Sequence, residues 1–200
     1  MTPAEFRKLT FWVDYDRRKL GALTDGQRIE YFRRRTNLVA LRPFRDLLRG
    51  IRPESRRSST VLCLGTCVCC AIEAIGRFHA GKVKEDGGAC FRAFVHDFMS
   101  PSYSRLLGSS TYSSHLWKYF RNGLAHGLAI TRGGLEASSR YLRRRKRGGV
   151  QQLVIDPERL QSDLEAAVAK FIAALKTSPD RAQRMERFNR VFEALWVRGR

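Results

Sequence analysis

Apolar residues recur at helical spacing along most of the chain, and this periodicity predicts a mainly α-helical protein. The first fifty residues carry two such segments. Thr24 and Gln27 have the spacing of a capping box, which predicts that the second helix begins there. Pro43 is expected to end or bend this helix, because proline lacks the amide hydrogen that a helix interior donates.

A polar connector at residues 52–59 interrupts this pattern and predicts a boundary. The expected organisation is an N-terminal helical extension over residues 1–52, a helical domain over residues 60–176 and a C-terminal amphipathic helix over residues 179–200. Asp156 begins a long helix of the domain. An aspartate cap followed at once by proline is a favourable helix start.

The helical domain is expected to contain three further helices before its pattern changes. They cover residues 60–80, residues 91–98 and a segment that begins at Ser113 or Ser114. Gly81 should end the first of them, since glycine is common just after a helix.

After Gly127 the apolar period shortens to that of β-strands. Residues 128–131 and 150–155 are expected to be strands, with a turn at 132–134, and the basic run at 143–147 is expected at the exposed tip of a hairpin or loop. The predicted fold is therefore an α-helical bundle with a small β-hairpin addition.

The chain carries 38 Lys and Arg residues against 19 Asp and Glu residues, which gives a net charge of +19. Such a field attracts polyanions and makes their binding sensitive to salt. Nucleic acid is the expected partner, and an acidic membrane surface is the lesser alternative. The charge carries no information on sequence specificity.

Two further patterns favour a cytoplasmic protein with no membrane span. The chain opens without a secretory signal, and its longest apolar run, at residues 61–72, is shorter than the ~20 residues that a span needs. Its five cysteines are an odd number, and four of them crowd into residues 63–70, unlike a secreted disulfide framework.

The cysteine cluster admits two interpretations. Cys63, Cys67 and Cys70 share one helical face, which suggests a structural zinc protein. However, zinc sites usually pair two short ligand clusters across a loop, and the sequence has no second pair with that spacing. The favoured interpretation is that these cysteines act as small buried hydrophobic residues, and no metal or other cofactor is expected.

The hexapeptide Arg121-Asn122-Gly123-Leu124-Ala125-His126 carries the most specific chemistry. Arginine holds its charge at any physiological pH and fits phosphate oxygens, whereas histidine titrates near pH ~6.5 and can transfer a proton. RNA supplies its own nucleophile, the 2′-hydroxyl. His126 could therefore act as base or acid, Arg121 could stabilise the phosphorane, and Asn122 could orient either group.

Helical geometry leaves this site incomplete within one chain. Five residues separate Arg121 from His126, which places them about 140° apart around an ideal helix. One histidine would also have to make both proton transfers. Arg121 could reach round, or the helix could distort near Gly123, but a second copy of the chain would solve both difficulties. A homodimer is therefore expected.

The motif Arg-Asn-x-x-x-His, with Leu116-Trp117-Lys118-Tyr119-Phe120 before it and Gly127 after it, resembles that of the HEPN superfamily. The resemblance covers about residues 60–176. It implies a helical bundle that works as a dimeric, metal-independent endoribonuclease, a hydrolase acting on RNA, with Arg121, Asn122 and His126 as catalytic residues. It also allows a toxin–antitoxin or defence role with an antitoxin or regulatory protein as partner, although the tyrosine of one antitoxin-paired branch is replaced here by Leu128.

Several alternatives stay open beside the nuclease. Many HEPN-like domains are non-catalytic modules that bind RNA or a partner, and Arg121 could simply form a surface ion pair. Glu73, the one acid of an apolar stretch, either contacts Arg121 or His126 or lies in water. Tyr119 is a possible supporting residue. The expected RNA-binding residues are Arg143, Arg144, Arg145, Lys146 and Arg147.

Overall fold

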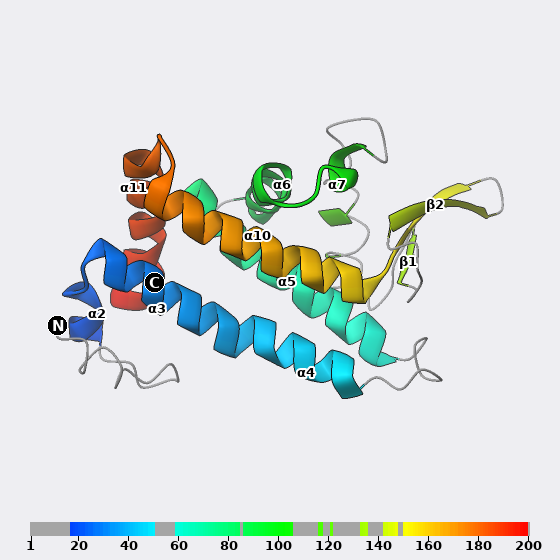
Figure 1. The fold of residues 1–200 in the computed structure, drawn as a ribbon, viewed down its shortest axis with the longest axis horizontal. Coiled ribbons are helices and arrows are strands. Elements are labelled where there is room, and N and C mark those ends of the chain that lie inside the picture. The colour runs from blue at the N-terminus through cyan, green and yellow to red at the C-terminus, as the bar shows by residue number, and fades with distance from the viewer. Residues whose placement is uncertain are drawn as a thin grey trace.

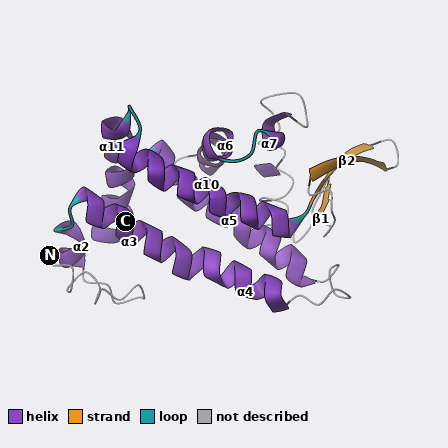
Figure 2. Ribbon diagram, viewed as in Figure 1, coloured by secondary structure: helices purple, strands orange, loops and turns teal. Residues whose placement is uncertain are grey.

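The protein is described here from a computed structural model, which defines residues 17–50, 59–84, 86–105, 116–117, 121, 133–135, 142–147 and 150–199. These residues form a mainly α-helical packed bundle of about six helices (Figure 1). The strands gather at the end of the bundle opposite α11, on the right of the view (Figure 2). The helical fold class predicted from periodicity is thus confirmed.

The elements have the following bounds in chain order. They are α2 (Arg17–Gly21), α3 (Asp25–Thr36), the π-helical turn η1 (Asn37–Leu41), α4 (Arg42–Gly50), α5 (Ser59–Ala80), α6 (Gly87–Phe98), α7 (Ser102–Arg105), β1 (Gly133–Leu135), β2 (Leu142–Arg147), β3 (Val150–Ile155), α10 (Pro157–Thr177), α11 (Arg181–Phe192) and the π-helical turn η4 (Glu193–Val197).

Helix α5 is the centre of the bundle, since α4, α6, α10 and α11 all pack against it (Figure 1). Its window Cys63–Ala80 is long and apolar enough to cross a membrane by length and composition, and 56% of that window is buried inside the protein. The apolar residues of this helix therefore serve largely to pack it against the rest of the protein.

The N-terminal helices begin as the capping box predicts but continue past the proline. Thr24 accepts a hydrogen bond from the backbone of Gln27 at 3.4 Å, and the Gln27 side chain accepts one from the Thr24 backbone at 3.1 Å. Pro43 does not end the helix. The chain widens into η1 immediately before it and then continues as α4. A wider turn absorbs the missing hydrogen bond of proline without breaking the helix.

A single hydrophobic core joins the two ends of the chain. Phe32 of α3 stacks against Phe78 of α5, Phe171 of α10 and Phe188 of α11, with ring centroids 4.9 to 5.9 Å apart. Edge-on aromatic pairs of this kind stabilise beyond the area they bury. The described parts of residues 1–52 and 179–200 therefore share a core with the central helices. The first of the two helical segments expected in the first fifty residues lies outside the described residues apart from α2.

The strands form a three-stranded sheet of order β1-β3-β2, one strand more than the expected hairpin addition. Strand β3 pairs antiparallel with β2 and parallel with β1. Residues 143–147 lie within β2 and not at a loop tip, and Gly133 and Gly134 lie in β1 and not in a turn. The physical reason is that β3 presents backbone donors and acceptors along both edges, and the short polar strand β2 and the glycine-containing strand β1 each pair with one of them. The expected strand at 128–131 lies outside the described residues.

Two helix boundaries predicted from single residues are confirmed. Gly81 follows α5 with a φ of 71°, in the left-handed region that glycine adopts without strain. Asp156 caps α10 by accepting hydrogen bonds from the backbones of Glu158 and Arg159. The N-terminus of α6 is different, because Asp86 caps it with a φ of 24°.

Helices α5 and α6 approach closely at Gly76, and this contact leads to a first prediction. A β-carbon at Gly76 would lie 2.4 Å from the Cys90 carbonyl oxygen. We expect Gly76→Ala to lower the free energy of unfolding by about 1–3 kcal/mol, because backbone atoms must move to admit the methyl group. Chemical denaturation monitored by circular dichroism measures this change.

Gly26→Ala is the matched control, since a β-carbon there meets nothing within 4 Å in helix α3. It should leave stability unchanged or raise it by up to about 1 kcal/mol. Equal effects of the two substitutions would contradict a close α5–α6 contact.

Candidate functional site

Glu73 of α5 lies at the centre of a buried ion-pair cluster. Its side chain is only 11% exposed. Oε1 accepts a hydrogen bond from Arg77 Nη2 at 2.9 Å, and Oε2 accepts one from Arg121 Nε at 2.9 Å. A second nitrogen of Arg121, Nη2, lies 2.7 Å from Oε2. Of the alternatives left open for Glu73, the structure therefore shows the contact with Arg121.

Arg121 is held by an aromatic ring as well as by the carboxylate. Its guanidinium carbon lies 4.7 Å from the centroid of Trp117, one helical turn earlier in the chain. Trp117 in turn packs against Phe91 of α6, with centroids 5.4 Å apart. A cation over an aromatic face adds about 0.5–2 kcal/mol, depending on how far the pair is desolvated. The guanidinium therefore has a defined orientation, and the Arg121 side chain is 19% exposed.

The N-terminus of α6 contributes to the same cluster through its glycines. A β-carbon at Gly87 would lie 2.3 Å from Glu73 Oε1, and one at Gly88 would lie 2.9 Å from Trp117 Nε1. The first turn of α6 can approach the carboxylate only because these positions have no side chain. The positive end of the helix dipole then adds to the two guanidinium groups in stabilising the buried negative charge.

Arg77 belongs to this cluster and was not identified from the sequence. Besides bonding Glu73, it donates a hydrogen bond from Nη1 to the Val83 carbonyl oxygen at 2.9 Å. The signal available in the sequence was the four-residue spacing of Glu73 and Arg77, which allows an ion pair on one helix face.

The structure describes only some of the other site residues that the sequence predicts. Asn122, His126 and Tyr119 lie outside the described residues. Arg143–Arg147 form most of β2, an outer strand of the sheet. Of the three motif residues, the structure therefore describes Arg121, which it brings together with Glu73, Arg77 and Trp117.

The cysteines of α5 differ in exposure and form no metal site with their described neighbours. Cys69 is buried, Cys67 and Cys70 are half-buried, and Cys63 is exposed. Burial raises the pKa of the Cys69 thiol to about 12 and that of Cys67 to about 11, so both stay protonated at neutral pH. Within the described ranges, no group of three His, Cys, Asp or Glu side chains has the arrangement of a metal site. A protonated thiol is a poor ligand and nucleophile.

A second polar cluster joins α5 to α6 away from Arg121. The carboxylate of Asp97 lies 2.8 Å from Nε2 of His79 and 2.8 Å from Nδ1 of His96. His79 is buried, and its Nδ1 has no hydrogen-bond partner in the part of the chain that the structure describes. Burial lowers the pKa of His79, although Asp97 opposes this effect. The buried ring is therefore held in its neutral form with Nε2 donating to Asp97.

Comparisons with known proteins do not identify a family for this chain. No protein-family model, no curated protein and no solved structure matches this chain.

The buried cluster generates a prediction on stability. Glu73→Gln removes the negative charge that two arginines share and leaves them partly buried without compensation. We expect the free energy of unfolding to fall by about 3 kcal/mol, the order of magnitude for breaking a buried pair. Urea denaturation of the purified protein measures this loss.

Asp46→Asn is the matched control, because Asp46 also lies between two arginines but on the surface of α4. Its side chain is 53% exposed, with Arg42 at 3.9 Å and Arg49 at 3.3 Å. Its loss should cost less than about 1 kcal/mol. If Glu73→Gln were no more destabilising than this control, the cluster would not be structurally important.

The buried, neutral His79 ring leads to the prediction that the contact between α5 and α6 becomes less stable at acidic pH. Its pKa in the fold lies below 6.5, the value for an unperturbed histidine, so the folded state binds this proton less tightly than the unfolded chain. Its contribution to stability should be complete above pH 6.5 and decrease as the pH falls towards the folded pKa. Unfolding curves between pH 7.5 and 5 should show a shallower pH dependence for His79→Gln than for the wild type. Equal pH dependence of the two proteins would contradict this role of His79.

Proposed function

We propose that this protein is a HEPN-like, metal-independent endoribonuclease that cleaves RNA by attack of the 2′-hydroxyl on the adjacent phosphate. The proposal assigns the phosphate-stabilising role to Arg121, the proton transfer to His126 and a positioning role to Asn122. Two copies of the chain would contribute their motifs to one cleft. RNA is then the partner, and an antitoxin or regulatory protein is a further one.

The observation that carries the proposal is the fixed orientation of Arg121. A guanidinium held between the Glu73 carboxylate and the Trp117 ring has little conformational freedom left to lose when it meets a phosphate. Charge placed in advance where negative charge develops is the largest contribution in many enzymes. Glu73 thus supports the site by orienting the arginine, without itself reaching the substrate.

The sheet gives additional support through its charge. Strand β2 consists of Leu142 followed by five cationic residues, and it lies at an outer edge of the sheet. Such a strand offers dense positive charge to a phosphate backbone, and its charge also discourages pairing with strands of other proteins. Binding through it would be independent of sequence and sensitive to salt.

A second candidate function is a non-catalytic module that binds RNA or a protein partner on the same fold. The observation that favours it is that Glu73 already neutralises Arg121 inside the protein. An arginine with this partner can serve the packing of α5 against α6 alone. The two functions differ in whether RNA is cut after it is bound.

The decisive experiment compares RNA cleavage by the wild type, His126→Ala and Arg121→Lys in the presence of a chelator. A general acid or base typically contributes 10²- to 10⁴-fold. We therefore expect His126→Ala to lower the cleavage rate at least about 100-fold with RNA affinity nearly unchanged. Arg121→Lys keeps the charge but loses the planar fork, so it should also impair cleavage.

His96→Ala serves as the matched control, because it removes an exposed histidine of α6 and should leave cleavage at the wild-type rate. Circular dichroism establishes that each variant is folded. Wild-type protein that binds RNA without cutting it would support the binding module, and cleavage that stops with the chelator would contradict a metal-independent mechanism.

A further inference from the structure

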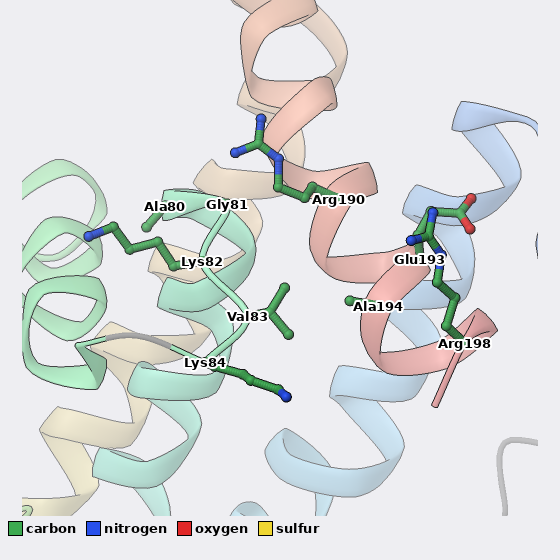
Figure 3. A pocket seen from close by; sticks show the side chains of 9 residues that line it. All are labelled: Ala80, Gly81, Lys82, Val83, Lys84, Arg190, Glu193, Ala194 and Arg198. Atoms are coloured by element: carbon green, nitrogen blue, oxygen red, sulfur yellow. The ribbon is translucent and has the colours of Figure 1, made fainter. Parts of the chain in front are cut away.

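A pocket of about 680 Å³ lies between the turn that follows α5 and the C-terminal helix, remote in sequence from the Arg121 motif. One wall is the segment Ala80–Lys84, and the other is formed by Arg190, Glu193, Ala194 and Arg198 (Figure 3). This volume is within the range of about 300–1,000 Å³ that is typical of small-molecule sites.

The charges around this pocket are strongly unbalanced. Lys82, Lys84 and Arg198 have no ion pair with any residue that the structure describes, and Lys82 and Lys84 are exposed. Arg190 is paired with Glu186 at 2.9 Å. The single acid of the lining, Glu193, is bound by Arg28 from α3 at 2.5 Å. Among the described residues, three positive charges around one cavity therefore have no acidic partner.

The negative end of the α5 helix dipole opposes anion binding in this pocket only weakly. A helix C-terminus carries the equivalent of about half a negative charge. Here the Arg77 carbonyl oxygen already accepts hydrogen bonds from the backbone nitrogens of Gly81 and Lys82, at 2.9 and 3.2 Å. The charges of Lys82, Lys84 and Arg198 outweigh this partial charge several-fold, so the electrostatic field in the pocket favours a ligand with more than one negative charge.

The pocket also has an apolar part. Val83 and Ala194 face one another across it, with Lys82 and Lys84 on the α5 side and Arg190 and Arg198 on the C-terminal helix (Figure 3). A ligand that combines several phosphate groups with a flat apolar ring would use both features. A nucleoside triphosphate has this combination, and an inorganic polyphosphate shares the charged part alone.

We propose that this pocket is a binding site for a small polyphosphate ligand of the nucleoside di- or triphosphate class, held by Lys82, Lys84 and Arg198. The site is separate from the proposed nuclease centre, and its occupancy does not depend on whether the protein cuts RNA. It requires no metal and no chemical step.

Isothermal titration calorimetry with ATP, tripolyphosphate, adenosine and a short single-stranded oligoribonucleotide tests this proposal. The pocket variant is Lys82→Ala/Lys84→Ala/Arg198→Ala. The control variant is Arg33→Ala/Arg42→Ala/Arg49→Ala, which loses the same charge from exposed positions on α3 and α4. We expect the wild type to bind ATP, the pocket variant to bind it at least tenfold more weakly, and the control variant to stay within about twofold of the wild type.

The other ligands identify the source of the phosphates. Tighter binding of ATP than of tripolyphosphate supports a nucleotide, and equal binding supports an inorganic polyphosphate. Adenosine alone should not bind. The proposal is overturned if the control variant loses as much affinity as the pocket variant, because the net charge of the protein would then explain binding. It is also overturned if ATP and tripolyphosphate fail to bind while the oligoribonucleotide depends on the three pocket residues.

Discussion

One buried carboxylate organises the centre of this protein. Glu73 lies in the most apolar of the helices that the structure describes, where an uncompensated charge would cost several kcal/mol. Two arginines and the positive end of α6 compensate it, and each comes from a different part of the structure. The positions of α6, of Arg121 and of the turn after α5 are therefore linked to this one charge.

Arg77 connects the two regions to which we assign functions. It bonds the Glu73 carboxylate that holds Arg121, and it also bonds the Val83 carbonyl oxygen in the wall of the cationic pocket. These contacts form a continuous polar path between the pocket and the arginine motif. A path of contacts becomes a functional coupling only when both sites bias the same element between two states.

The helical part of the fold could be predicted because its signals are local. The capping box at Thr24, the glycine after α5 and the Asp-Pro start of α10 each act within one turn of helix. The sheet was predicted less well, because the partner of a strand depends on residues far along the chain. Of the two effects expected of Pro43, ending or bending its helix, the first is wrong, since a π-helical turn before it keeps the helix continuous.

The sequence by itself determined the helical class, the strong positive charge and the presence of an arginine–histidine motif. Only the tertiary structure decided that Glu73 is buried against Arg121 and that Arg77 and Trp117 belong to the same cluster. It also brought the turn after α5 against the C-terminal helix to form a cationic pocket. The physical reason is that burial and charge compensation depend on which distant segments meet, and periodicity along one helix carries no information about that meeting.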